Sequence, residues 1–281
     1  MSLQNFTPTI WAAKLLVRLE KSHVAAGIVN RDYEGEIQDK VNSVRINAVG
    51  DITIKDYDKN TEIDSAENLN DAGQELLIDQ AKYFNFKVDD IDKVQTNANV
   101  MGEAMSRAGY GLRDKVDIFI ASSHILVPAA NFVGTDGAPI TPTKDDAYDY
   151  LVDLNTKLDE ANVPAEGRFA IVPPWFEGLL LKDSRFIAAG TAKTDDVIRN
   201  GMIGRAAGFD IYKSNNTPNN NGTQYKVIAG HPMAYSFAEQ IVKTEAYRPE
   251  KSFADGVKGL HVYGGRLVRP YAWAVGTFNK S

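Results

Sequence analysis

Cysteine is absent from the 281 residues, and several other features that would point to a class of protein are also missing. Without cysteine the chain forms no disulfide and has no thiolate for catalysis or metal binding, so a cytoplasmic protein is expected. No run of about 18 apolar residues occurs, and no membrane-spanning helix is predicted. The N-terminus lacks the basic stretch, apolar run and cleavage site of a signal peptide.

Histidine is scarce, and its four copies have no metal-ligand spacing. They lie far apart in the chain: His23, His124, His231 and His261. The sequence has neither a Gly-x-Ser-x-Gly nucleophile elbow nor a Walker loop. The glycines of residues 201–208 lack the strand–turn–helix order of a dinucleotide fingerprint, so packing and turns explain them better. No cofactor is predicted, and an α/β enzyme is kept only as a minor alternative.

An excess of basic residues is also missing, since the net charge is −6. The charge is unevenly spread along the chain. Residues 31–92 hold sixteen acidic and seven basic side chains, a net of −9, whereas residues 248–281 hold six basic and two acidic ones, a net of +4. Nucleic-acid binding depends mainly on neutralising phosphates, so sequence-specific DNA or RNA recognition is not expected.

A strand that runs into a long helix is predicted over residues 76–112, the stretch around which the other elements are arranged. Its first part alternates apolar and polar residues as a strand does, with one face formed by Phe84, Phe86 and Val88. From about Asp90 apolar residues recur at steps of three and four, as on one face of a helix: Ile91, Val94, Ala98, Met101, Met105, Ala108 and Leu112. Gly109 and Gly111 predict the end of this helix near Leu112.

A long acidic ribbon is predicted before this helix, with one extended segment in residues 31–57 and a return strand in residues 75–88. Residues 58–73 between them are polar and acidic, as in a solvated tip. An isolated hairpin is marginal in water, so the apolar residues of the ribbon need a cover. If the ribbon projects from the body, that cover is another molecule.

The tip of the ribbon also resembles a calcium-binding loop in its spacing of oxygen ligands. The candidate ligands are Asp56, Asp58, Asn60, Asp64 and Glu67. Against this, Thr61 stands where the loop needs glycine, the preceding residues favour a strand over a helix, and no second loop is present. A solvated acidic tip is therefore the preferred interpretation, and no metal is predicted.

The rest of the chain mixes helices and strands, which predicts an α+β fold. Strands are predicted over residues 116–121, 168–172, 208–213, 224–229, 260–263 and 267–275. Helices are predicted from Thr143 to Ala161, from Pro174 to Leu181, from Val197 to Asn200 and over residues 231–241. Gly264-Gly265 predicts a hairpin between the last two strands.

In this order of elements the chain resembles the major capsid proteins of tailed bacteriophages, which have the Hong Kong 97-type fold. The resemblance covers nearly the whole length and depends on the combination of stretches rather than on one signature. The stretches are FTPTIWAAKLL (Phe6–Leu16), NRDYEGEI (Asn30–Ile37), LLIDQAKYFNFKVDDID (Leu76–Asp92), GMIGRAAGFDIYKSNN (Gly201–Asn216) and GVKGLHVYGGRLVRPYAWAV (Gly256–Val275).

The resemblance implies a division of the chain into an N-terminal arm, an extended β-hairpin loop, a peripheral domain with a long spine helix, and an axial α/β domain. The arm is residues 1–30, and the extended loop with its flanking strands is residues 31–88. The spine helix and its surroundings are residues 89–122, the axial domain is residues 123–239, and residues 240–281 complete the peripheral domain.

The resemblance also implies a non-enzymatic shell protein that assembles with itself into hexamers and pentamers in the bacterial host cytoplasm and is found in the virion capsid. The expected partners are a separate scaffolding protein, because a long N-terminal scaffolding segment is missing, a portal and a possible decoration protein. Packaged DNA is contacted only non-specifically, and no membrane is involved. An encapsulin-like compartment of the same fold, which holds protein cargo, is the main alternative.

Contacts between subunits are predicted from charge and exposed apolar residues. The acidic ribbon and the basic C-terminal region are complementary, which guides association and register more than affinity. The charged candidates are Asp56, Asp58, Glu62 and Asp64 on the ribbon, and Arg248, Lys251, Arg266 and Arg269 on the basic region. Burial of apolar side chains between subunits supplies affinity. The candidate apolar contact residues are Trp11, Ile46, Ile52 and Ile54.

Overall fold

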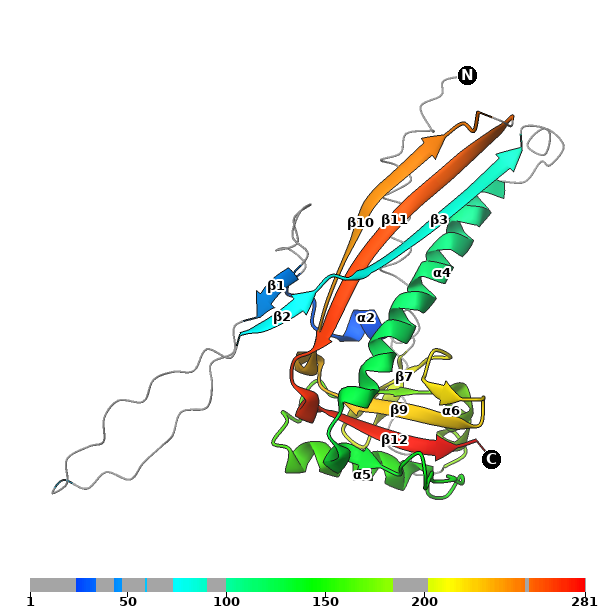
Figure 1. Ribbon diagram of the computed structural model, residues 1–281. Helices are drawn as coiled ribbons and strands as arrows, with labels where there is room; N and C mark the ends of the chain where they lie inside the picture. The colour runs from blue at the N-terminus through cyan, green and yellow to red at the C-terminus, as the bar shows by residue number, and fades with distance from the viewer. Residues whose placement is uncertain are drawn as a thin grey trace.

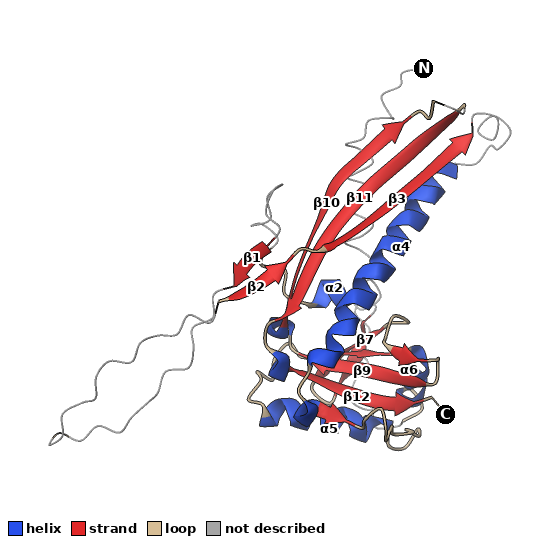
Figure 2. Cartoon of the chain, viewed as in Figure 1, coloured by secondary structure: helices blue, strands red, loops and turns tan. Residues whose placement is uncertain are grey.

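The fold consists of a long helix–sheet layer that stands on a mixed α/β body, with a small two-stranded ribbon at its side (Figure 1). The computed structural model describes residues 24–33, 43–46, 59, 73–89, 100–183, 202–250 and 253–280. The predicted helix over Val197–Asn200, the first turns of the predicted spine helix and most of the predicted arm lie outside these residues. The α+β class is confirmed, because antiparallel sheets and separate helices dominate (Figure 2).

The helix–sheet layer packs α4 (Val100–Ser122) along an antiparallel sheet in the order β10-β11-β3. Its strands are β3 (Gln80–Asp89), β10 (Tyr235–Tyr247) and β11 (Ala254–Leu267). The predicted alternation in β3 is confirmed, because Phe84, Phe86 and Val88 pack in one cluster with Met105 and Leu112 of the helix. Their polar neighbours in β3 are exposed on the other face.

The helix α4 does not end at Gly109 and Gly111, as the sequence analysis predicted, but continues to Ser122. The predicted strand over Val116–Ala121 is therefore wrong. Val116 and Ile120 are buried at a spacing of four, which continues the apolar stripe of the helix. A glycine inside a helix costs about 1 kcal/mol relative to alanine, and burial of this stripe outweighs that cost.

Replacing Gly111 by alanine is expected to stabilise the protein by about 0.5–1 kcal/mol, because alanine restricts the unfolded chain and favours the helix. A β-carbon at Gly111 meets no atom within 4 Å, so no steric penalty opposes this gain. Chemical denaturation followed by circular dichroism measures the change. An unchanged or lowered stability would contradict the packing described for this face of α4.

Residues 231–241 form a strand rather than the predicted helix. After a single 3₁₀ turn at Pro232–Ala234, β10 runs antiparallel to β11 from Tyr235↔Leu267 to Tyr247↔Gly256. Tyr235, Phe237 and Ala238 are buried on both faces of this strand. The sequence therefore does not alternate between apolar and polar residues as a half-exposed strand does.

The predicted hairpin at Gly264-Gly265 is also wrong, because β11 passes straight through both glycines. The connection between β10 and β11 lies instead at residues 248–253. A β-carbon at Gly264 would be 2.1 Å from the carbonyl oxygen of Leu77, and one at Gly265 would be 2.4 Å from the hydroxyl of Tyr235. These glycines therefore allow close approach of neighbouring elements, and they do not make a turn.

The body is built on a sheet in the order β4-β12-β9-β5-β7-β6, with β8 paired to β9. Its strands are β4 (Phe132–Val133), β5 (Phe169–Val172), β6 (Met202–Ala206), β7 (Phe209–Lys213), β8 (Asn219–Asn220), β9 (Gln224–Gly230) and β12 (Trp273–Asn279). Helix α5 (Ala147–Glu160) contacts β9 and β12, and α6 (Pro174–Leu180) packs on β12 through the stacked rings of Phe176 and Phe278. Three 3₁₀ turns also lie in the connections: η3 (Ser123–Leu126), η4 (Ala129–Asn131) and η6 (Pro270–Ala272).

Several predictions for the body are confirmed. The predicted strands over residues 168–172, 208–213 and 224–229 correspond to β5, β7 and β9, and the helix predicted from Pro174 is α6. The stripe of α5 is buried at Ala147, Leu151, Leu154 and Leu158. The helix itself starts at Ala147 rather than Thr143, because the Asp146 carboxylate accepts a hydrogen bond from the Thr143 N–H and holds a turn before it.

The boundary predicted at residue 240 does not match the sheets. The strand β10 of the helix–sheet layer already begins at Tyr235, and β12 at the end of the chain lies in the body between β4 and β9. One apolar cluster runs from the body through Tyr235, Phe237 and Tyr263 into the layer. The chain therefore crosses between the two parts more than once, and they share a core.

Candidate assembly surfaces

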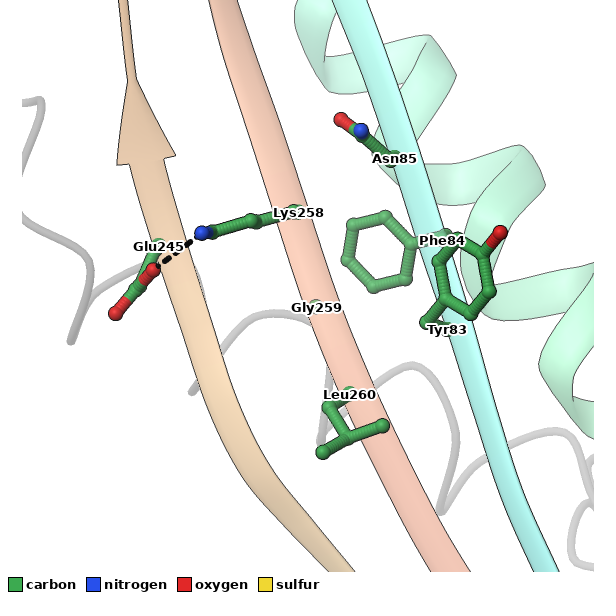
Figure 3. Close-up of a pocket in the computed structure, with 7 residues that line it drawn as sticks. All are labelled: Tyr83, Phe84, Asn85, Glu245, Lys258, Gly259 and Leu260. Atoms are coloured by element: carbon green, nitrogen blue, oxygen red, sulfur yellow. Dashed lines mark ion pairs between the residues drawn. The ribbon is translucent and has the colours of Figure 1, made fainter.

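A groove of about 290 Å³ lies on the helix–sheet layer, where the ring of Phe84 packs over Gly259 (Figure 3). Tyr83 and Leu260 face each other across β3 and β11 and are 78% and 36% exposed. Beside them Lys258 forms an ion pair with Glu245 at 2.9 Å. Large apolar side chains that stay exposed next to a groove are typical of an interaction surface.

A second groove, of about 400 Å³, follows the line between β3 and α4. Ala108 and Gly111 of the helix are small and leave this space open, while Lys82 and Lys115 line it with positive charge. Tyr83 and Phe84 line both grooves, so this part of β3 is accessible from its two sides.

These grooves carry no arrangement of residues typical of an active site. Among the residues that the structure describes, no group of three His, Cys, Asp or Glu side chains could hold a metal ion. The described histidines are separated: His124 contacts the Ala121 carbonyl oxygen, His231 accepts from the Met233 N–H, and the buried His261 lies 3.0 Å from Glu239. No described helix is long and apolar enough to cross a bilayer.

His231 makes the stability of the body depend on pH, because burial lowers the pKa of its imidazole. Its Nδ1 accepts from the Met233 N–H at 3.2 Å, which requires an unprotonated Nδ1. Below about pH 6.5 the unfolded chain binds a proton that the folded chain binds only at lower pH. The stabilising contribution is thus complete above about pH 6.5 and is lost as the pH falls from there through the lower pKa of the folded chain.

We expect the loss of stability between pH 7.5 and pH 5.5 to be smaller in His231→Asn than in the unmodified chain. The asparagine oxygen can accept the same backbone hydrogen bond but does not titrate. Urea denaturation at both pH values measures this difference. Burial lowers the pKa of His124 as well, so part of the pH dependence remains in the variant. Identical pH dependence in the two proteins would contradict the role of His231.

The predicted contact residue Ile46 is covered by its own chain. It lies in β1 (Ser43–Ile46), which pairs with β2 (Gln74–Leu77) to form the base of the ribbon. Ile46 is 4% exposed and packs with Leu76 and Ala238. The prediction that a neighbouring copy covers it is therefore wrong, because the base of the ribbon folds against β10 of the same chain.

The described basic candidates lie at the surface, with two of them in contact with their own chain. Arg248 is 3.9 Å from Asp255 at the end of the β10–β11 hairpin. Arg266 donates to the Glu75 carbonyl oxygen at 2.8 Å and so connects β11 with β2. Arg269 is exposed. The other candidates lie outside the described residues: Trp11, Ile52, Ile54, Asp56, Asp58, Asn60, Glu62, Asp64, Glu67 and Lys251.

Several exposed apolar side chains of the layer were not predicted from the sequence. Tyr83 and Leu260 belong to predicted strands, but only the pairing of β3 with β11 places them side by side on the open face. Phe253 precedes β11 at the end of the hairpin and is 83% exposed. A large apolar residue next to charged ones in a connection between strands is the one signal that could have indicated it.

Comparison with known proteins identifies this architecture. A family model described as phage capsid protein matches residues 73–276. The chain belongs to the phage capsid protein family. A solved structure from Mycobacterium phage Che8 is similar with 37% sequence identity and a TM-score of 0.72 over 92% of this chain and 91% of that one. The comparison with curated proteins gave no match.

Two more distant structures share the fold. The capsid structure of the cyanophage P-SCSP1u has a TM-score of 0.71 at 16% identity and covers 93% of this chain and 90% of that one. A virus-like particle from Pyrococcus furiosus has a TM-score of 0.63 at 14% identity and covers 98% of this chain and 100% of that one. At such identities the likeness shows the fold alone.

The predicted resemblance to tailed-phage major capsid proteins, with their Hong Kong 97-type fold, is confirmed by these matches. The capsid protein is a structural component of the virion shell, and its family implies a role other than catalysis. The encapsulin-like alternative is less supported, because its likeness is restricted to the fold.

Proposed function

We propose that the chain is the major subunit of an icosahedral shell of hexamers and pentamers that encloses the double-stranded DNA of a tailed phage. The observation that carries this proposal is an extended helix–sheet layer with exposed Tyr83, Leu260 and Phe253 in a chain of the phage capsid family. Side chains of this size supply most of the affinity when a partner buries them.

The partners and the place of assembly form the finer part of the proposal. The shell assembles in the bacterial cytoplasm with a separate scaffolding protein, a portal and, in some shells, a decoration protein. The net charge of −6 suits a container from which DNA must be released, because a chain of net negative charge holds phosphates weakly.

Charge guides the association between copies. The acidic residues 31–92 and the basic residues 248–281 have opposite net charges of −9 and +4. Arg248 and Arg269 are exposed and can meet carboxylates of a neighbour. Contacts of this kind steer the encounter and weaken as salt increases.

Expression of the full chain with the scaffolding protein of its phage tests the proposal. Negative-stain images should show closed shells, and static light scattering should give a mass far above one chain of 30.9 kDa. Shells filled with protein cargo would favour the encapsulin-like alternative. A monomer or small oligomer under all these conditions would contradict the proposal.

Deletion of residues 59–71 is expected to give a folded chain that assembles poorly. The deletion removes the centre of the acidic segment and leaves β1, β2 and their register untouched. Circular dichroism should match the full chain, while the yield of shells falls by at least tenfold. Replacing residues 59–71 by a neutral Gly/Ser segment of equal length is the matched control for chain length. A normal yield from the deletion would show that this segment is not needed for assembly.

A further inference from the structure

Residues 24–33 form a strap that contacts three separate parts of the molecule. The strap contains the short helix α2 (Ala25–Ile28) and continues to Tyr33. It lies between α4 and the lower end of β10, close to the base of the ribbon (Figure 1). The division predicted from the sequence splits this segment between the arm (residues 1–30) and the extended loop (residues 31–88).

The first contact is polar and joins the strap to α4. Asp117 is 2% exposed, and its carboxylate accepts hydrogen bonds from three consecutive backbone N–H groups: Val24, Ala25 and Ala26, at 3.3, 3.2 and 3.4 Å. The N-terminal N–H groups of a helix have no partner within it, and here a side chain from another helix supplies the acceptor. This pairing orients α2 across α4.

The second contact is apolar and involves residues of the same short helix. Ala25, Ala26 and Val29 of the strap are at most 6% exposed. They belong to the same buried cluster as Val116 and Ile120, which flank Asp117 on α4. The strap therefore covers an apolar part of the helix that would otherwise face water.

The third contact joins the strap to β10. Asn30 pairs with this strand through its backbone, donating to the Tyr235 carbonyl oxygen at 3.1 Å and accepting from the Phe237 N–H at 2.9 Å. Arg31 forms an ion pair with Glu239 at 2.6 Å, and the other carboxylate oxygen of Glu239 lies 3.0 Å from His261 of β11. The Glu239 side chain is only 9% exposed, so water screens this pair little.

The strap ends at the base of the ribbon. Tyr33 packs against the cluster of Ile46, Leu76 and Ala238, which joins β1 and β2 to β10. Residues that precede Val24 and residues that follow Tyr33 are thus attached to the same ten-residue segment. Its position fixes Val24 and Tyr33, the two points at which the flanking stretches join it.

We propose that the strap is a positioning element for assembly, which sets the exits of the N-terminal stretch and of the ribbon relative to α4 and β10. The two positioning residues are Asp117 of α4 and Arg31 of the strap. This inference rests on the proposed function, because the stretches on either side of the strap are proposed there to make contacts between copies. A shell requires repeated contacts with the same geometry, and a rigid strap lowers the ordering cost of each one.

Hydrogen exchange of the unassembled chain tests the attachment independently of any shell. Asp117→Ala should make the amides of residues 24–26 exchange about tenfold faster, because they lose a buried acceptor. Asp114→Ala is the matched control, since it removes a carboxylate one turn away that accepts from Asn216. Unchanged exchange at residues 24–26 in Asp117→Ala would overturn the proposal.

Assembly of a second set of variants tests the role in positioning. Arg31→Ala should lower the yield of shells at least fivefold, while Arg31→Lys, which keeps the charge, should retain most of it. In the Arg31→Ala background, Asn30→Cys with Ser236→Cys replaces the lost ion pair by a disulfide, since these two residues form a backbone bridge and the chain has no other cysteine.

The oxidised double-cysteine variant should recover the yield, and reduction should abolish the recovery. If the strap is loosened in Asp117→Ala and Arg31→Ala but both variants still form normal shells, the positioning role is overturned. The proposed shell function would be unaffected by that result. Absence of shells from the unmodified chain would refute the proposed function and this proposal with it. In that case hydrogen exchange would still report whether Asp117 holds the strap.

Discussion

Replacing Arg168 by methionine is expected to lower the free energy of unfolding by about 3–5 kcal/mol. The Arg168 side chain is 1% exposed, although it carries a permanent charge. Its guanidinium donates to the carbonyl oxygens of Val163 and Pro164 and to the side chain of Asn155, and it pairs with Asp159 at 2.8 Å. Methionine fills a similar volume but leaves the buried Val163 oxygen and the partly buried oxygens of Pro164 and Asn155 without this donor.

The loop between α5 and β5 depends on this side chain. Arg168 directly precedes β5, so its hydrogen bonds hold the end of α5 at the start of a fully buried strand. Chemical denaturation followed by circular dichroism measures the stability. Arg205→Met is the matched control, because Arg205 also pairs with an aspartate, Asp210, but its side chain is 77% exposed.

An exposed pair of this kind contributes less than about 1 kcal/mol, and the control should lose no more than that. Equal losses in Arg168→Met and Arg205→Met would mean that burial of the guanidinium does not matter. A loss below about 1 kcal/mol in Arg168→Met would show that the loop satisfies its carbonyl groups in another way.

Replacing Gly264 by valine is expected to destabilise the protein by about 3 kcal/mol and to displace the base of the ribbon. A β-carbon at this position would lie 2.1 Å from the Leu77 carbonyl oxygen and 2.7 Å from the α-carbon of Ile78. Both are backbone atoms at the step from β2 to β3, so no side-chain rotation can relieve the overlap. The chain must move away from β11.

Limited proteolysis and denaturation measure the two parts of this result. Cleavage at residues 74–79 should become faster, and the free energy of unfolding should fall. Gly111→Ala is the control for a glycine with open space around it, and it should change stability in the opposite direction. If Gly264→Val kept its stability and resisted cleavage at residues 74–79, the close packing of β2 on β11 would be refuted.

The local patterns that the sequence predicted correctly are those in which one face of an element is buried. The helix α5 has apolar residues at helical spacing and polar residues between them, so its stripe was visible without any tertiary information. The strand β3 alternates in the same clear way. The fully buried strand β5 is an exception, because its short apolar run and the prolines that stop it were enough to predict it.

The errors occurred where glycine or complete burial hides the pattern. Gly109 and Gly111 looked like a helix end, yet the buried residues Val116 and Ile120 hold α4 together beyond them. Gly264 and Gly265 looked like a turn, but their missing side chains admit Leu77 and Tyr235. A sequence shows that a position lacks a β-carbon, and it does not show which neighbour needs the space.

The amino-acid sequence by itself determined the class of fold, the long helix after a strand, the absence of disulfide and thiolate chemistry, and the resemblance to phage capsid proteins. The first three follow from composition and local periodicity, which act over a few residues, whereas the resemblance depends on the combination and order of stretches along the chain. Only the tertiary structure decided that Asp117 holds residues 24–26, that Arg168 is buried and that Tyr83 meets Leu260 on an open face. Each of these contacts depends on packing or strand pairing between separate elements, and no local pattern in the sequence specifies the partner.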